Sequence, residues 1–351
     1  MSQRTISLLS GPALGLVLDG PVRPKGRKPP DIRSYAGKLM RVANKAPEVV
    51  VKVSGSGKKP GQILAHMTYI TRNGKLDAEN ERGEAIKGLA EVQDVFQEWG
   101  LDSSKASTRG RAHTVNIVLS MPEGTDPQAV LVAGRGFARE RFGDNHQYLL
   151  ALHTDTRQPH VHLAVKAQGF DLTWLKRSKA DLQEWRERFA QKMRDQSVEA
   201  EATPRRARGV IRKAKTQAMN HLAKEPKRST VMRAKVDDAI REIDGQKPAA
   251  DQPWDRAIVE RQSKVRGAYE AIAKELRGGG DELSRDVGEQ VAGFLAGLPP
   301  IETERTKLKR QLAAVMSIDR TAERTPARER GKSSPGAPVD GSARGKDVRA
   351  R

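Results

Sequence analysis

Cysteine is absent from the chain, which excludes disulfides, thiolate metal sites and cysteine nucleophiles. No apolar run reaches the ~18 residues of a membrane span, and no strongly amphipathic basic anchor stands out. The start of the chain has no signal-peptide pattern, because its mildly apolar stretch, residues 6–17, is interrupted by glycine and proline. We therefore expect a cytoplasmic protein without membrane insertion, in which any metal site uses nitrogen and oxygen ligands.

Acidic residues are too few to balance the basic ones. The 351 residues include 64 Lys and Arg against 44 Asp and Glu, which gives a formal net charge of +20. Such an excess favours a polyanionic partner, and nucleic acid is the first candidate. An anionic membrane surface is the alternative, although nothing in the sequence forms an anchor for it.

Aromatic residues are also few, and their distribution divides the chain. Of the 14 aromatic residues (six Phe, four Trp, four Tyr), only Trp254, Tyr269 and Phe294 follow residue 202. Composition predicts four regions: a basic, largely irregular extension over 1–46, a globular unit over 47–202, a basic helical region over 203–320 and a disordered basic tail over 321–351. With so few large apolar residues, the third region is expected to form extended helices or a thin bundle.

Apolar periodicity predicts the elements within these regions. Strands are expected at Val49–Val53, Ala112–Met121, Tyr148–His153 and His160–Val165. Helices are expected at Ile32–Asn44, Pro60–Arg72, Ala85–Trp99, Asp126–Phe142 and Ser178–Val198, and later at Arg233–Asp244, Arg256–Leu276, Glu282–Leu295 and Glu304–Val315. Strands alternating with helices over residues 47–202 are typical of a compact α/β or α+β unit.

Three of the seven histidines fall within the ten residues His153–His162 (HTDTRQPHVH). His160 and His162 share one face of their strand because they are two residues apart. The intervening Thr-Asp-Thr-Arg-Gln-Pro has turn chemistry, so an antiparallel pair brings His153 beside them. Three imidazoles with an open position are typical of a catalytic metal site, in which Asp155 would orient one ring. The alternative is a histidine pair that merely faces solvent on an edge strand.

A metal site alone suggests hydrolysis, whereas a nucleophilic side chain would give a covalent intermediate. Among the four tyrosines, Tyr69 is expected on a helix after a Gly-rich loop, outside the apolar stripe and close to Arg72 and Lys75. A tyrosine with its ordinary pKa near 10 needs a base, a metal or positive charge to attack at neutral pH. Physical reasoning alone favours an ordinary surface tyrosine at this position.

Three segments resemble the motifs of conjugative relaxases, the histidine–hydrophobic–histidine nucleases, in the family's order. His153–His162 is similar to the third motif, HxDxxxPHxH. Gln62–Leu76 resembles the first motif of the P-type branch, especially that of the agrobacterial T-DNA border endonuclease, in which Leu-Ser/Thr-Arg-x-Gly-Lys follows a tyrosine. His113–Asp126 is similar to the second motif, whose strand-end serine corresponds to Ser120. The similarity covers roughly residues 47–210, with Trp174-Leu175-Lys176 matching the region after the third motif.

The resemblance implies an α+β, palm-type nuclease domain with an antiparallel-centred sheet flanked by helices, followed by a mainly helical basic region. It implies that Tyr69 attacks a phosphodiester at an origin of transfer, leaving a 5′-phosphotyrosyl bond and a free 3′-hydroxyl. Asp155 would support a histidine or help to activate Tyr69, while Arg72, Lys75 and Ser120 bind DNA. His66 lies on the side of Tyr69, but the family motif asks for no histidine there.

The same resemblance implies the cofactor and the partners. His153, His160 and His162 would hold a divalent cation, with Mn or Mg favoured and Zn or another transition metal the alternative. The partners would be single-stranded origin DNA, an accessory origin-binding protein and a type IV secretion coupling protein. The protein would act in the bacterial cytoplasm and be exported to a recipient cell while attached to its strand.

Two other functions compete with this reading. A rolling-circle replication initiator shares the paired histidines and a tyrosine, but usually places the tyrosine after the histidine motif. A non-catalytic DNA-binding accessory protein would owe its affinity to phosphate contacts and would form no covalent adduct. The basic helical region, in turn, has two interpretations: extra DNA contacts or a signal for export.

Overall fold

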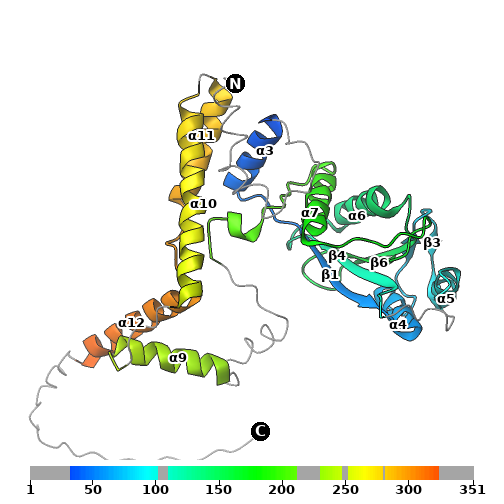
Figure 1. Cartoon of the computed structure of the whole chain (residues 1–351), viewed down its shortest axis with the longest axis horizontal. Coiled ribbons are helices and arrows are strands. Elements are labelled where there is room, and N and C mark those ends of the chain that lie inside the picture. The colour runs from blue at the N-terminus through cyan, green and yellow to red at the C-terminus, as the bar shows by residue number, and fades with distance from the viewer. Residues whose placement is uncertain (1–31, 102–109, 212–229, 247–251, 280, 324–351) are drawn as a thin grey trace, which may run out of the picture. The chain divides into compact units, whose positions relative to one another are not determined.

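The computed structural model describes residues 32–101, 110–211, 230–246, 252–279 and 281–323. The chain divides into two compact units, one formed by residues 1–214 and 250–304 and the other by residues 215–249 and 305–351. Figure 1 shows a sheet with helices on both faces in the first unit. The α+β class with an antiparallel sheet flanked by helices, expected from the sequence, is confirmed.

Six antiparallel strands form the sheet, in the order β1-β4-β6-β5-β2-β3. They are β1 (Val50–Gly57), β2 (Ala78–Asn80), β3 (Ala85–Ile86), β4 (Thr114–Ser120), β5 (Tyr148–His153) and β6 (His160–Lys166). The central strands β4, β5 and β6 are rich in apolar residues and almost wholly buried, as expected for strands covered on both faces.

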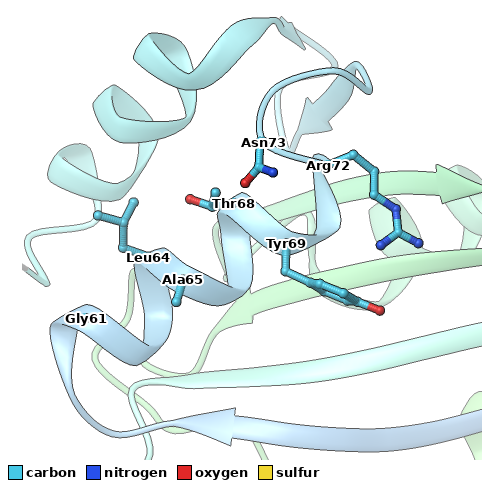
Figure 2. Close-up of a pocket in the computed structure, with 7 residues that line it drawn as sticks. All are labelled: Gly61, Leu64, Ala65, Thr68, Tyr69, Arg72 and Asn73. Carbon is cyan, nitrogen blue, oxygen red and sulfur yellow. The ribbon is translucent and has the colours of Figure 1, made fainter.

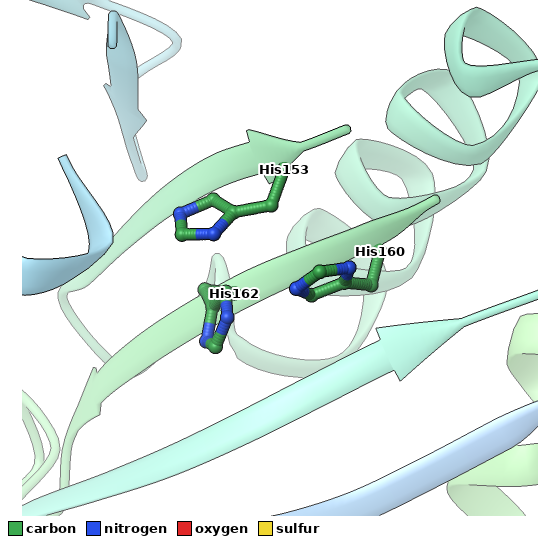
Figure 3. Close-up of side chains that lie close together, drawn as sticks. All are labelled: His153, His160 and His162. Atoms are coloured by element: carbon green, nitrogen blue, oxygen red, sulfur yellow. The ribbon is translucent and has the colours of Figure 1, made fainter. Parts of the chain in front are cut away.

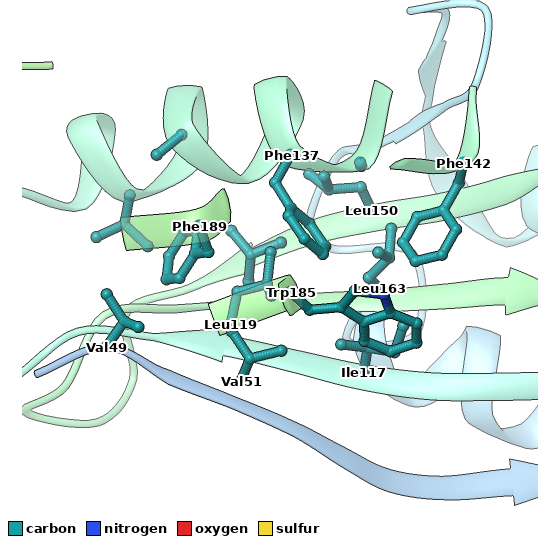
Figure 4. Close-up of a cluster of buried hydrophobic side chains, with 14 of the residues drawn as sticks. Val49, Val51, Ile117, Leu119, Phe137, Phe142, Leu150, Leu163, Trp185 and Phe189 are labelled. Atoms are coloured by element: carbon teal, nitrogen blue, oxygen red, sulfur yellow. The ribbon is translucent and has the colours of Figure 1, made fainter. Parts of the chain in front are cut away.

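Helices α6 (Pro127–Phe142) and α7 (Lys179–Arg194) cover one face of this sheet. The odd-numbered residues of β4 and β6 point into this layer, where Phe137, Trp185 and Phe189 form the centre of the core (Figure 4). Both helices begin at side-chain caps. The Asp126 carboxylate accepts from two backbone amides of α6, and Ser178 forms a capping box with Asp181.

Helices α4 (Pro60–Ile70) and α5 (Gly88–Glu98) cover the opposite face. Ile63, Met67 and Ile70 are buried on one side of α4, as their spacing predicts. They pack with the even-numbered side of β6 through Ala164 and with Leu149 of β5. The remaining even-numbered positions toward the start of β6 are histidines, so α4 lies over the histidine end of the sheet.

The structure corrects two of the predicted elements. Strand β1 continues to Gly57 instead of ending at Val53, because residues 55–57 keep pairing with β4 beyond an irregularity after Val53. The helix expected from Ala85 begins only at Gly88, because Ala85 and Ile86 pair with β2. Local periodicity does not reveal either change, since both depend on a partner strand.

Helix α3 (Ile32–Ala43) lies within the extension that was expected to be largely irregular, where a short helix was predicted. It packs against α10 (Pro253–Arg277) and α11 (Glu282–Ala296) in a separate apolar cluster that includes Tyr35, Leu39 and Tyr269. Helices more than 200 residues apart in the sequence therefore share one small core, and α10 also contacts the 3-10 turn Arg205–Ala207. The predicted helices Ile32–Asn44, Arg256–Leu276 and Glu282–Leu295 are confirmed within three residues at either end.

The second unit contains α9 (Thr230–Ile243) and most of α12 (Glu304–Glu323). In it, Arg305 and Lys309 both pair with the buried carboxylate of Glu242. Residues 1–31 of the predicted extension and 324–351 of the predicted tail lie outside the described residues, whereas 321–323 are helical. Among the helices that the structure describes, none has the length and apolarity needed to cross a membrane.

Candidate active site

The three clustered histidines point from β5 and β6 toward a common position above the sheet (Figure 3). His153 pairs directly with His160 across the two strands, and His162 is opposite Ala151. One ring nitrogen from each histidine lies within 4.8 Å of those of the other two. The antiparallel pair expected from the sequence therefore brings the three imidazoles together on the sheet face that α4 covers.

Two of the rings are oriented by backbone carbonyls. The Nε2 of His153 lies 2.7 Å from the carbonyl oxygen of Ile70, at the end of α4. The Nδ1 of His160 lies 3.0 Å from the carbonyl oxygen of Gln158. A neutral imidazole that donates one N–H to a carbonyl keeps its other nitrogen as an acceptor. In this tautomer the nitrogens that could bind a cation are Nε2 of His160 and Nδ1 of His153, which faces Arg72.

His162 is buried, and its surroundings disfavour the charged imidazolium. Desolvation, followed by the neighbouring His153 and His160, lowers the pKa of His162 to about 3. Burial also lowers the pKa of His153. Both rings are therefore neutral at physiological pH, which is the form that binds metal ions. The Nδ1 of His162 is buried and has no hydrogen-bond partner.

These observations fit a divalent cation: three imidazoles, two of them oriented by backbone carbonyls, offer ring nitrogens within 4.8 Å of one another. A cation bound through Nδ1 of His153 would compete with the guanidinium of Arg72, whose Nη2 is 3.2 Å from that nitrogen. The donor set does not distinguish between metals, because imidazole suits several transition metals.

Tyr69 projects from α4 over the histidine cluster. Its ring centroid is 5.8 Å from that of His162 and 6.2 Å from that of His153. The side chain is 51% exposed, whereas the other three tyrosines, Tyr35, Tyr148 and Tyr269, are at most 4% exposed. Tyr69 is thus the one tyrosine that combines access to solvent with proximity to the histidines.

Arg72 connects Tyr69 to the histidine cluster. Its guanidinium lies 5.1 Å from the centroid of the Tyr69 ring and pairs with a carboxylate oxygen of Asp155. The other oxygen of Asp155 is 3.9 Å from Nδ1 of His153. Arg72, Asn73 and Gly74 all have positive φ, so the chain turns sharply where α4 ends. This turn holds Arg72 against the strand that carries His153.

The remaining predicted residues lie at different distances from this centre. Ser120 is opposite His160 on the neighbouring strand β4, so the two share a face of the sheet. Lys75 is exposed in the loop after α4. His66, left outside the predicted site, stacks on Tyr69 at 6.2 Å and lies 6.4 Å from His162. His66 and Tyr69 are three residues apart on a helix, so their side chains share a face. This spacing is the sequence signal that could have identified His66 as a site residue.

Residues 69–197 match the family model described as "Relaxase: MobA/VirD2-like, nuclease domain". The chain is 28% identical over 191 residues to the T-DNA border endonuclease VirD2 of Rhizobium radiobacter, an alignment that covers 49% of this chain and 45% of the relative. It is 25% identical over 233 residues to the VirD2 of Agrobacterium fabrum, covering 61% and 52%. The VirD2 of Rhizobium rhizogenes is 27% identical over 148 residues, covering 38% and 34%.

A solved structure titled "Molecular Basis of Vancomycin Resistance Transfer in Staphylococcus aureus" aligns with 45% of this chain and 98% of its own, at 16% identity. Its TM-score is 0.31. The chain spans about half the length or less of the curated relatives that it matches. The resemblance to relaxases similar to VirD2, expected from three motifs, is confirmed by the family model and these relatives.

Proposed function

We propose that this protein nicks one strand of DNA by transesterification, with Tyr69 as the nucleophile. The observation that carries the proposal is the exposed Tyr69 ring lying 5.8–6.2 Å from the rings of His162 and His153. The hydroxyl oxygen attacks the scissile phosphorus, and the 3′-oxygen of the upstream nucleotide leaves. The products are a 5′-phosphotyrosyl bond and a free 3′-hydroxyl, which can later attack the same bond and reseal the strand.

The neighbouring residues support this attack by position and charge. Asp155 is the candidate acceptor for the proton of the Tyr69 hydroxyl, directly or through a water, because it reaches the cluster from the turn after β5. Arg72 lies against the Tyr69 ring and places a fixed positive charge beside the attacked phosphate. Ser120 and Lys75 would contact the DNA backbone on either side.

The imidazoles of His153, His160 and His162 would hold a divalent cation, for which Mn or Mg is the favoured identity. When bound, such an ion polarises the oxygens of the scissile phosphate. The carbonyls of Ile70 and Gln158 orient two of these rings.

The relatives support a proposal for the substrate and the cellular role. The names of three relatives describe a T-DNA border endonuclease, and we infer an analogous single-stranded site at an origin of transfer on a plasmid or mobile element. We further propose that the chain starts conjugation from the bacterial cytoplasm, with an accessory origin-binding protein, and leaves the cell bound to its strand through a type IV secretion coupling protein. Deleting residues 321–351 should impair transfer between cells and spare nicking in vitro if this end serves export.

The test is to incubate the protein with labelled single-stranded origin DNA and Mn²⁺, then to map any modified residue by mass spectrometry. The expected product is one phosphotyrosyl adduct at Tyr69. DNA binding without any adduct would support a non-catalytic accessory protein. An adduct at another tyrosine would overturn the assignment of the nucleophile.

A further inference from the structure

A cavity of about 460 Å³ lies along the exposed side of α4, next to Tyr69 and outside the histidine cluster. Leu64, Ala65, Thr68, Tyr69 and Asn73 line it, together with Gly61 and Arg72. Figure 2 shows Leu64, Thr68 and Asn73 on one side and Tyr69 and Arg72 on the other, with Ala65 between them. Its volume is in the range of small-molecule sites.

We propose that this cavity binds the base of a nucleotide that flanks the scissile phosphate. This proposal rests on the proposed function, because the scissile phosphate is located by the Tyr69 hydroxyl that attacks it. The Tyr69 ring forms one wall, so any occupant lies beside the attacking group. A base joined to the attacked phosphate is the part of a single strand that reaches this far.

The walls have the chemistry that a single-stranded base requires. Leu64, Ala65 and the Tyr69 ring offer apolar and aromatic surface, on which bases stack irrespective of sequence. Arg72, at the end of the cavity, carries the charge that holds the adjoining phosphate. An apolar floor between a stacking ring and a cation is poorly matched to a free anion or a metal ion.

Thr68 and Asn73 add hydrogen-bonding groups at one edge. Within the described residues, neither the Thr68 hydroxyl nor the Asn73 side-chain amide has a hydrogen-bond partner, so both remain available. The amide of Asn73 presents a donor and an acceptor together, which matches the edge of a base. The backbone N–H of Asn73 donates to the Thr68 carbonyl at 2.8 Å, and its φ of 58° fixes the turn that presents the amide.

Asn73 lies between Arg72 and Gly74 in the turn that ends α4, so its amide and the Arg72 guanidinium are presented side by side. The cavity therefore separates two functions along α4: Tyr69 and Arg72 act on the phosphate, and Asn73 selects the base.

The test measures binding of fluorescein-labelled single strands about 12 nucleotides long, of dA, dC, dT or abasic residues. We expect the wild-type protein to bind one of the homopolymers about tenfold more tightly than the abasic strand. Ala65→Trp, which fills the cavity, should reduce that ratio to about twofold and leave affinity for the abasic strand unchanged. Gln62→Trp, also exposed on α4 but outside the cavity, is the matched control and should keep the wild-type ratio.

Asn73→Ala is the second variant, and it removes the side-chain amide while leaving the apolar walls of the cavity in place. It should retain the preference for strands with bases but lose the differences among dA, dC and dT. Equal base-to-abasic ratios in Ala65→Trp and Gln62→Trp would overturn the proposed base site while leaving the nicking function standing. If the wild-type protein binds none of the single strands, the proposed function fails as well.

Discussion

The guanidinium of Arg72 donates to Nδ1 of His153 at 3.2 Å, although one residue lies in the turn after a helix and the other ends a strand. The same guanidinium lies over the Tyr69 ring and pairs with Asp155. One side chain therefore fixes the position of the candidate nucleophile relative to the histidine cluster. This arrangement makes the contribution of each residue separately testable.

Tyr69→Phe should abolish the covalent adduct with single-stranded DNA and leave DNA affinity within about twofold, because phosphate contacts dominate binding. The measurement is adduct formation on a denaturing gel together with fluorescence anisotropy. Tyr148→Phe is the control, since that tyrosine is buried and burial raises its pKa to about 12. An adduct that persists in Tyr69→Phe would show that another group attacks.

Arg72→Lys should slow adduct formation by about tenfold or more, even though the charge is retained. A lysine ammonium cannot stack flat on the Tyr69 ring while also reaching His153 and Asp155, as the planar guanidinium does. The single-turnover rate of adduct formation is the quantity to measure. Arg82→Lys, in an exposed ion-pair network with Glu84 and Glu98, is the control and should leave the rate unchanged. Equal rates for both variants would exclude a positioning role for Arg72.

His160→Ala should weaken binding of Mn²⁺ by about 100-fold, because one of three converging imidazoles is lost while the Ile70 carbonyl continues to orient His153. Isothermal titration calorimetry measures this without reference to activity. His113→Ala removes a histidine at the far end of β4 and should leave the affinity unchanged. If both variants bind Mn²⁺ like the wild type, the three histidines are not the ligands.

Sequence patterns predicted the histidine end of the sheet well, because its determinants are local. The turn residues between His153 and His160 and the apolar strands around them specify an antiparallel pair, and the observed register places the two histidines opposite each other. The face that they occupy follows from the two-residue period of a strand. The roles proposed for them stay predictions until metal binding is measured.

Other parts of the site depend on contacts between distant segments, which the sequence does not display. The approach of Arg72 to Asp155 requires three successive residues with positive φ, of which only Gly74 carries an obvious signal. His66 lies beside both Tyr69 and His162 because α4 packs on the sheet at one particular angle. In the same way, α3 could not be assigned to the cluster with α10 and α11, since its partners are more than 200 residues away.

Without metal, the protein should lose stability as the pH falls below 6.5, and His162 should account for much of the loss. The pKa of His162 is lowered to about 3, so the folded state does not take up the proton that the unfolded state binds near pH 6.5. The unfolded state then binds more protons, and the free energy of unfolding decreases with falling pH. For this one group the decrease is about 1.5 kcal/mol between pH 6.5 and 5.

Urea denaturation in the presence of a chelator measures this pH dependence. His162→Gln should have a free energy of unfolding that falls less steeply over the same pH range, by about the same 1.5 kcal/mol. Identical pH dependence in the wild type and in His162→Gln would mean that the buried ring is protonated in the folded state.

Gly74→Ala should destabilise the protein by about 2–4 kcal/mol, because two costs add at this position. The residue has a φ of +75°, and a Cβ would lie 2.5 Å from the backbone nitrogen of Leu89 and 2.6 Å from the carbonyl carbon of Gly88. Gly83→Ala is a matched control, since its φ is +80° but a Cβ there meets nothing within 4 Å. That variant should lose only about 1 kcal/mol.

The difference in stability between the two glycine variants measures the cost of the close contact between the turn and the start of α5. Because the turn also carries Arg72, a backbone shift at Gly74 should slow adduct formation, whereas Gly83→Ala should react at the wild-type rate. Thermal denaturation and single-turnover kinetics on the same preparations provide both measurements. Equal losses of stability in the two variants would show that the turn relaxes away from α5 without cost, and that the helix does not hold Arg72 in place.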